Sequence, residues 1–401
     1  MLITLAQARF PKPDFTSGYE YPNMDLVPFY ASTDCFKLLL YVALMVFVGF
    51  AIYKWRSKKL LLLASFVSVA VIGFYLKACP CPVGLFQTTF DFILNAEANY
   101  NIIYFLIFAL PIVFALFWGR VFCGGACPLG AFQELLFIKE LKIPKFIDKL
   151  LRLVPYFIIC ACISFASVSG PAIACAYDPI VPVFRMSAFM NMSIVSAVFV
   201  ILCLFISRPY CKYFCPYSVL LKSASYLSNK SVKITKAKCI GCALCEPMCP
   251  NGAIIIPDGK FADDKKIARI KNIILLLPAF VLVGLLIGYV FGLGLYEFHP
   301  ALNLYADLQN SVDDFNTQVY WQNHTSMQYI EDVLVSLRWK MSISSAITMA
   351  VMSLLVAWDL IRSAKKRHST EYEVDRGLCY LCGRCYASCP VEVQSQKEES
   401  K

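Results

Sequence analysis

The sequence predicts an all-α polytopic membrane protein with a small, cysteine-rich α+β domain attached to it. Of its 401 residues, 59% are hydrophobic and only 16% are charged, whereas soluble domains carry roughly 25% charged residues. The mean hydropathy is +0.61, and so much apolar surface is typical of a chain that faces lipid. The chain also contains 19 cysteines, most of them at the spacings of metal ligands.

The membrane part is predicted to have about seven transmembrane helices. A hydrocarbon core about 30 Å thick requires roughly 20 mostly apolar residues. Suitable segments lie near 36–53, 60–76, 101–118, 153–169, 193–207, 270–295 and 341–358. The fourth and fifth are short, so we expect them to extend further or to be partly re-entrant. The first 34 residues lack an apolar run with a small-residue cleavage site, so we expect no cleavable signal peptide.

The basic residues predict the orientation. When these segments are threaded through a bilayer, 30 of the 37 lysines and arginines fall on one side. Cytoplasmic loops are enriched in these residues, so the N-terminus is expected outside and the C-terminus inside the bacterial cytoplasmic membrane. A basic flank beside membrane lipid also explains the net charge of +10, and no nucleic-acid partner is expected.

Two cysteine runs have the spacing with which bacterial ferredoxins bind 4Fe–4S clusters. In each, three cysteines at intervals of three residues form a loop around one cluster, and a fourth cysteine precedes a proline. In two-cluster ferredoxins this fourth cysteine binds the other cluster. The sequence therefore predicts two 4Fe–4S clusters with crossed ligands. These are Cys239, Cys242, Cys245 and Cys389 for one cluster, and Cys379, Cys382, Cys385 and Cys249 for the other.

The two runs are expected to form one ferredoxin-like cytoplasmic domain. Two transmembrane helices separate them, and a helical pair returns the chain to the side that it left. Zinc is the alternative metal, but zinc sites favour two Cys-x-x-Cys pairs. Free thiolates require a reducing compartment, which agrees with the cytoplasmic side.

An internal repeat adds two wider cysteine pairs. Each follows the pattern Arg-x-x-Cys-x-x-x-Cys-Pro and begins at Arg120 or Arg208, just inside the end of a predicted span. We expect the four thiols at one membrane depth, where they would suit a third 4Fe–4S cluster shared by the repeats. Free thiols or a redox dithiol are the alternative. The four cysteines are Cys123, Cys127, Cys211 and Cys215.

Further cysteines lie in Pro-rich outer loops upstream of these pairs. Cys79 and Cys81 precede the first pair and Cys175 precedes the second, while Cys35 is expected near the same surface. They could bind metal between the repeats or form disulfides in an oxidising space, and the sequence leaves both possibilities open.

The predicted organisation has five parts. They are an outer N-terminal segment (1–34), a membrane domain with the repeat (35–230), a first ferredoxin half (231–266), two transmembrane helices with an outer loop (267–360), and a second ferredoxin half (361–401).

The segments GRVFCGGACPLGAFQELL, CPCPVGLFQ and RPYCKYFCP resemble the membrane region of NosR/NapH-type membrane-bound 4Fe–4S polyferredoxins. The resemblance implies a subunit of an oxidoreductase complex that passes electrons between a quinol or cytoplasmic donor and an extracytoplasmic acceptor. Such a subunit needs no catalytic residue of its own. NosR-type proteins carry an outer flavin domain, and only 34 residues precede the first predicted span, so flavin is expected only on a redox partner, outside the membrane. The alternative is a CcoG-like factor for metalloenzyme assembly, although CcoG-type proteins usually end in an extra β domain, which we do not find.

Overall fold

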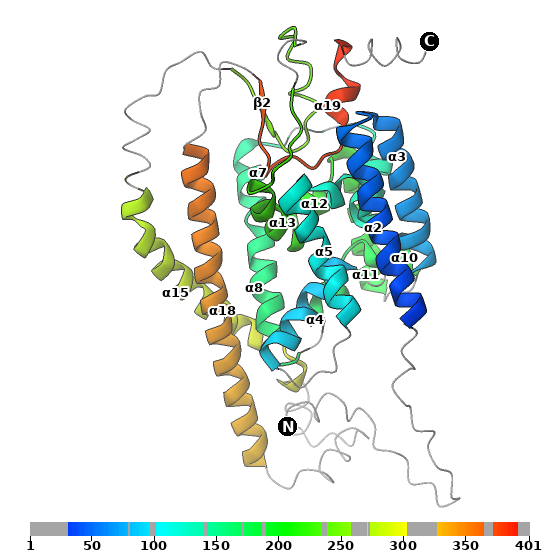
Figure 1. The fold of residues 1–401 in the computed structure, drawn as a ribbon. Helices are drawn as coiled ribbons and strands as arrows, with labels where there is room; N and C mark the ends of the chain where they lie inside the picture. Colours follow the sequence, from blue (N-terminus) through cyan, green and yellow to red (C-terminus); the bar gives the residue numbers. More distant parts are fainter. Residues whose placement is uncertain are drawn as a thin grey trace, which may run out of the picture.

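The computed structural model describes residues 31–78, 81–95, 102–139, 141, 143–170, 172–186, 190–234, 239–257, 271, 273–302, 327–364 and 372–391. This part of the chain is mostly helical (Figure 1). Within it, four helices are long and apolar enough to cross a membrane. They are Asp34–Tyr53, Lys58–Tyr75, Leu277–Tyr296 and Glu331–Arg362.

The first two of these helices form an antiparallel pair. Helix α2 (Ala31–Tyr53) is joined by a short turn to α3 (Lys58–Val67), which continues as the π-helix η1 (Ser68–Tyr75). The wider π-helical turn begins at Ser68, whose hydroxyl donates a 2.8 Å hydrogen bond to the carbonyl oxygen of Ala126. Such π-helical insertions often mark functional sites, and here the insertion faces the first inner cysteine motif.

The repeat units consist of shorter helices. Their bounds are α4 (Pro82–Asn95), α5 (Ile102–Trp118), η2 (Phe122–Ala126), α6 (Pro128–Leu136), α7 (Lys145–Leu151), α8 (Val154–Ala166), α9 (Ile173–Ala176), α10 (Val181–Arg185), α11 (Met190–Phe205), α12 (Pro209–Tyr213) and α13 (Tyr217–Tyr226). Helices α5, α8 and α11 have 17, 13 and 16 residues. At 1.5 Å per residue they extend only about 20–26 Å, so seven full spans are not seen.

The chain turns back into the bundle after α5 and α11 instead of leaving it. Gly119 has φ +70° after α5, and Arg208 has φ 52° after α11. A left-handed residue breaks the helical path, and the inner cysteine motifs that follow therefore lie inside the helix bundle.

Helices α15 (Leu277–Tyr296) and α18 (Met327–Ala364) form a closely packed pair beside α8. Gly284, Gly288 and Gly292 lie one turn apart on α15 and are buried. A Cβ on Gly288 would be 2.6 Å from the carbonyl oxygen of Ser345 in α18. Only glycine permits such a close approach of two helices, which is a common mode of packing in membranes.

A two-stranded antiparallel sheet joins the two ferredoxin runs at the upper end of the bundle in Figure 1. Strand β1 (Ile254–Ile255) pairs with β2 (Glu373–Val374), with Ile254 opposite Val374. The short helix α19 (Arg384–Ala387) follows in the second run. We call this end, which carries residues 239–257 and 372–391, the upper end.

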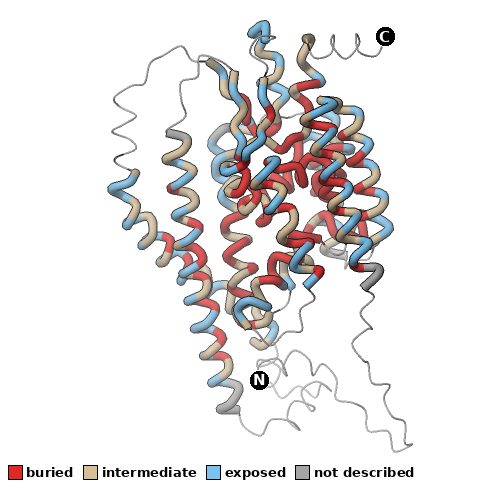
Figure 2. Tube along the Cα trace, in the orientation of Figure 1, coloured by how far each residue is buried: buried red, intermediate tan, exposed pale blue. Residues whose placement is uncertain are grey.

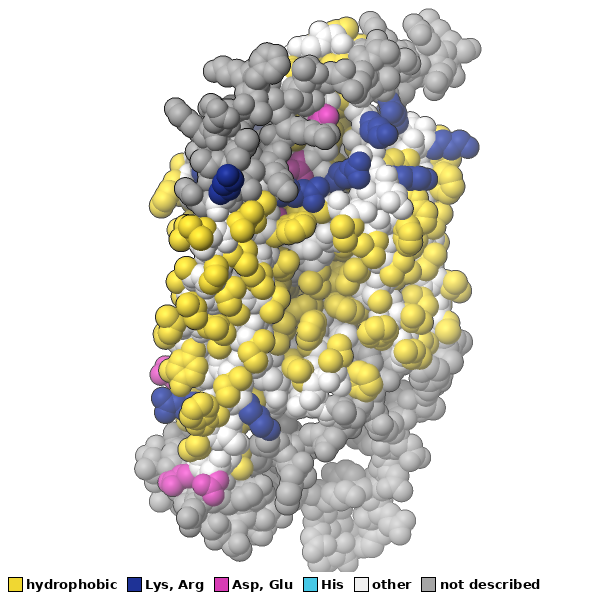
Figure 3. Space-filling view, turned by 60° about the vertical axis from the view of Figure 1, so that its left-hand side comes forward, with side chains coloured by type: hydrophobic (Ala, Val, Ile, Leu, Met, Phe, Trp, Pro, Cys, Tyr) yellow, Lys and Arg dark blue, Asp and Glu magenta, His cyan; other side chains and the backbone are white. Residues whose placement is uncertain are grey.

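The surface has the pattern of a membrane protein. A broad band of hydrophobic side chains covers the face shown in Figure 3, and lysines and arginines gather above and below it. The buried residues are concentrated in the middle of the repeat helices (Figure 2). Helix α15 exposes Leu282, Leu286 and Val290 by 61–68%, which is favourable only against lipid.

Candidate metal centres

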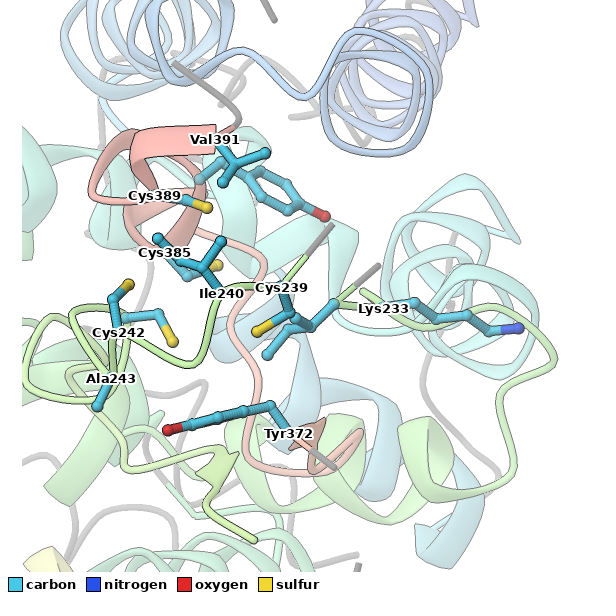
Figure 4. A pocket seen from close by; sticks show the side chains of 12 residues that line it. Lys233, Cys239, Ile240, Cys242, Ala243, Tyr372, Cys385, Cys389 and Val391 are labelled. Carbon is cyan, nitrogen blue, oxygen red and sulfur yellow. The ribbon is translucent and has the colours of Figure 1, made fainter. Parts of the chain in front are cut away.

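The first ferredoxin run shares a pocket with the last two cysteines of the second run. Figure 4 shows Cys239 and Cys242 facing Cys385 and Cys389 across this pocket. Cys245 also lines it and lies within electrostatic reach of Cys239, Cys242 and Cys389. Three cysteines of one run and the final cysteine of the other are therefore neighbours in space.

A second pocket gathers the complementary set of thiols. Those that line it are Cys249, Cys379, Cys382 and Cys385. Cys385 lies within electrostatic reach of the other three. A 2.8 Å hydrogen bond from Asn251 Nδ2 to the carbonyl oxygen of Leu378 holds the two runs together beside it. The first pocket therefore contains the thiols predicted for one cluster and the second pocket those predicted for the other, and Cys385 lines both pockets.

The thiols that line the two pockets are the ligand type of a 4Fe–4S cluster. Among the residues that the structure describes, no three His, Cys, Asp or Glu side chains could hold one metal ion. Thiolates around a 4Fe–4S cube bind different iron atoms, so they lie farther apart than the ligands of one ion. Burial raises the pKa of Cys379 to about 12, so a thiolate there needs the positive charge that iron provides.

The two inner cysteine pairs have similar local structures in the two repeats. Cys123 lies on the short helix η2 and Cys211 on the short helix α12. Cys127 and Cys215 each precede a proline at the start of the next helix, α6 or α13. All four are buried, and Cys211 lies within electrostatic reach of the other three. The repeat therefore brings the four inner thiols together.

Two buried arginines cross between the repeats around the inner thiols. Arg208, from the second repeat, donates hydrogen bonds to the main-chain carbonyl oxygens of Cys123 and Gly124 in the first. Arg120, from the first repeat, donates a 2.5 Å hydrogen bond to Ser218 Oγ in the second. Because both guanidinium groups are buried, their positive charges stabilise thiolates or any other negative group in this region.

Gly130 and Gln133 lie directly beside the inner thiols. A Cβ on Gly130 would lie 3.5 Å from Cys211 Sγ and 3.5 Å from the carbonyl oxygen of Cys123. Gln133 Nε2 lies 3.7 Å from the same sulfur and donates to it. Four buried thiols with a hydrogen-bond donor suit a third 4Fe–4S cluster.

The structure places Cys81 beside the inner thiols rather than at the outer surface. Cys81 is buried immediately before α4, and lies within electrostatic reach of Cys127 and Cys215. The reason is the path after η1, where Lys77 and Ala78 have φ of 52° and 53° and turn the chain inward.

The other predicted outer cysteines do not form one group in the described structure. Cys175, on α9, lies within electrostatic reach of Cys81. Cys35 is exposed near the start of α2, at the end opposite the ferredoxin runs. Cys79 lies outside the described residues.

An apolar cavity lies between α8 and α12, next to Cys81. Its lining includes Cys162, and its polar groups include Asp178, Tyr210 and Tyr177. Asp178 is buried, and its Oδ2 accepts a 2.5 Å hydrogen bond from the Tyr210 hydroxyl. Its Oδ1 accepts a 2.9 Å hydrogen bond from the N–H of Ile180. The cavity therefore combines apolar walls with one buried carboxyl group.

Sequence reasoning missed the acidic residue that joins the second ferredoxin run to the repeats. Glu134 accepts hydrogen bonds of 2.8 and 2.9 Å from Arg384 and of 3.0 Å from Arg208. A signal was present: Glu134 stands seven residues after Cys127, and Lys222 stands seven residues after Cys215. A charged residue at the same offset in both repeats, within otherwise apolar helices, indicated a specific role.

The fold and these thiol groups define a class of membrane-bound proteins with sites suited to iron–sulfur clusters. Two family models described as 4Fe-4S binding domains match the chain. One matches residues 100–146 and 188–235, which contain the inner cysteine motifs. The other matches residues 232–255, which contain the first ferredoxin run.

Within this class, the chain is similar to NosR/NirI-type membrane-bound 4Fe–4S proteins over part of its length. It is 33% identical over 165 residues to Protein NirI of Paracoccus denitrificans. It is 26% identical over 184 residues to YccM of Escherichia coli, whose printed name describes an electron transport protein. It is 28% identical over 169 residues to Regulatory protein NosR of Pseudomonas aeruginosa. These matches cover 38%, 42% and 39% of this chain, and 24%, 52% and 24% of the relatives. The chain thus spans about half the length of these relatives or less. No solved structure matches it.

Proposed function

We propose that the protein passes electrons between a quinol or cytoplasmic donor and an extracytoplasmic acceptor, as a subunit of an oxidoreductase complex. The observation that carries this proposal is the continuous series of thiol groups. The two ferredoxin pockets share Cys385, and the second is joined to the inner thiols through Tyr380. Cys81 and Cys175 extend the series away from the upper end. When bound, 4Fe–4S clusters at the two ferredoxin pockets and at the inner thiols would serve as one-electron carriers.

The proposed topology places the upper end in the bacterial cytoplasm. The turn between α2 and α3 carries Lys54, Arg56, Lys58 and Lys59 at this end. An excess of lysine and arginine favours the cytoplasmic side. In this topology α5, α8 and α11 complete seven membrane segments around the inner thiols, and the N-terminal segment lies outside with the redox partner. Flavin would be supplied by that partner.

The cavity beside the inner thiols supports a quinol as donor. Its apolar walls suit a lipid-soluble ring, and the carboxyl group of Asp178 can accept a proton from a hydroxyl group. We expect Asp178→Asn to lower quinol-dependent reduction of the protein by roughly tenfold or more, the scale of a lost general base. Reduction by dithionite should stay at the wild-type level. Asp359→Asn is the control, because Asp359 pairs with Lys222 outside this cavity. Equal quinol-dependent rates in both variants would argue for a cytoplasmic donor.

The experiment that tests the proposed function is quantification of iron and sulfide, with EPR spectroscopy, on anaerobically purified protein. About twelve iron atoms per chain would match three cubes, and about eight would match the ferredoxin pockets alone. A correctly folded protein without iron or acid-labile sulfide would contradict the proposal.

A further inference from the structure

Tyr380 lies between the second ferredoxin pocket and the inner thiols, and the functions assigned so far give it no role beyond this contact. It follows Cys379 in the chain and precedes Cys382 by two residues, and both cysteines line that pocket. Its side chain is nevertheless directed at the membrane repeats, where it is only 4% exposed. A tyrosine buried to this degree normally has its hydroxyl satisfied by a specific partner.

Three contacts hold Tyr380 against the membrane repeats. Its hydroxyl donates a 3.2 Å hydrogen bond to the main-chain carbonyl oxygen of Cys211. The guanidinium carbon of Arg120 lies 4.4 Å from the ring centroid, and that of Arg208 lies 6.0 Å from it. The phenol is also within electrostatic reach of Cys123 and Cys211. The loop that carries thiols of one site is therefore bonded directly to a residue that carries a thiol of the other.

We propose that Tyr380 couples the second ferredoxin site to the inner thiol site and that electrons pass between the two sites through it. A continuous route runs from Cys379 along the main chain and ring of Tyr380, and then across one hydrogen bond to Cys211. The inference rests on the proposed function, since it requires both sites to hold redox groups.

The step through Tyr380 needs no chemical change in the tyrosine. One electron leaves the reduced site and arrives at the oxidised site, while no bond forms or breaks and no proton is released. Tyr380 begins and ends as a neutral phenol. Arg120 and Arg208 hold the ring by cation–π contact, and their positive charges stabilise the additional negative charge at either site.

The test compares Tyr380→Met with Tyr386→Met in the full-length protein reconstituted in vesicles. Tyr386 is a matched control because it belongs to the same run and is only 7% exposed. Its ring, however, faces Arg56, whose guanidinium carbon lies 5.6 Å from the ring centroid. Freeze-quench EPR after rapid mixing with dithionite measures how fast each site becomes reduced, and iron content shows that the sites are filled. In Tyr380→Met we expect the inner site to be reduced roughly tenfold more slowly or worse, the effect of a modest rise in barrier. In Tyr386→Met, which replaces a side chain that lines both ferredoxin pockets, the inner site should be reduced no more slowly than the ferredoxin sites.

A further variant separates the ring from the hydrogen bond. Tyr380→Phe keeps the ring between the arginines and loses only the bond to Cys211, so we expect an intermediate rate. An inner site reduced at the wild-type rate in a fully loaded Tyr380→Met protein would overturn the inference. If Tyr380→Met loses iron, a wild-type rate in Tyr380→Phe would overturn it instead. Wild-type protein without clusters would refute the proposed function itself, which is a different outcome.

Discussion

Glu134 is the residue whose replacement tests most sharply how the second ferredoxin run is attached to the membrane repeats. Glu134→Gln keeps the size of the side chain but removes the negative charge that hydrogen-bonds to both Arg208 and Arg384. The side chains of all three are at most 7% exposed. Removing one partner of a buried ion pair typically costs about 3–5 kcal/mol, because the remaining charge stays buried without compensation.

For Glu134→Gln we take about 4 kcal/mol, which corresponds to roughly a thousandfold shift toward the undocked state of the second run. The assay is limited proteolysis of the full chain in detergent, with cleavage in residues 372–391 followed by mass spectrometry, together with thermal unfolding. We expect faster cleavage in this segment and a lower midpoint temperature.

A partly exposed ion pair provides the control for Glu134. Asp148 pairs with Arg152 at 2.9 Å, and their side chains are 21% and 31% exposed. Because exposed pairs contribute only about 0–1 kcal/mol and Asp148 keeps Lys212 as a second partner, Arg152→Gln should change cleavage and unfolding little. If Glu134→Gln resembles wild type in both assays, the buried charges do not hold the run in place and the reasoning is wrong.

Two further predictions concern the crossed thiols and the helix pair. Cys389→Ala should remove the same EPR signal as Cys239→Ala, because both cysteines line the first pocket although they lie in different runs. Loss of different signals in the two variants would contradict the crossed arrangement. Gly288→Ala should lower the thermal midpoint, because a Cβ would stand 2.6 Å from the carbonyl oxygen of Ser345. Gly294→Ala meets nothing within 4 Å and should stabilise α15 by about 0.5–1 kcal/mol, so equal midpoints in the two variants would contradict the close packing.

The cofactor class and the membrane class could be predicted from local patterns alone. The spacing of Cys239, Cys242 and Cys245 reflects how a short loop surrounds a cluster, and this requirement does not depend on the rest of the fold. The apolar segments likewise follow from composition, because lipid excludes charged side chains wherever the helices pack. The related 4Fe–4S proteins and the apolar helices confirm both classes.

The number of full spans could not be predicted in the same way. Hydropathy measures the length of an apolar segment, but not whether the chain then leaves the membrane. Turns with positive φ at Gly119, Lys77 and Arg208 direct the chain back into the bundle, and their effect depends on the partners that the returning segments meet. Cys81 was for this reason expected at the outer surface, and the structure places it beside Cys127.

By itself, the sequence determined the class of cofactor and the membrane class, because ligand spacing and hydrophobicity are properties of short segments. Only the tertiary structure decided which thiols become neighbours and how the sites are joined. Glu134 meets Arg384 across 250 positions of sequence, and Tyr380 meets Cys211 across 169. No local pattern specifies such contacts, since they exist only after the repeats have packed and have buried the charges that need each other.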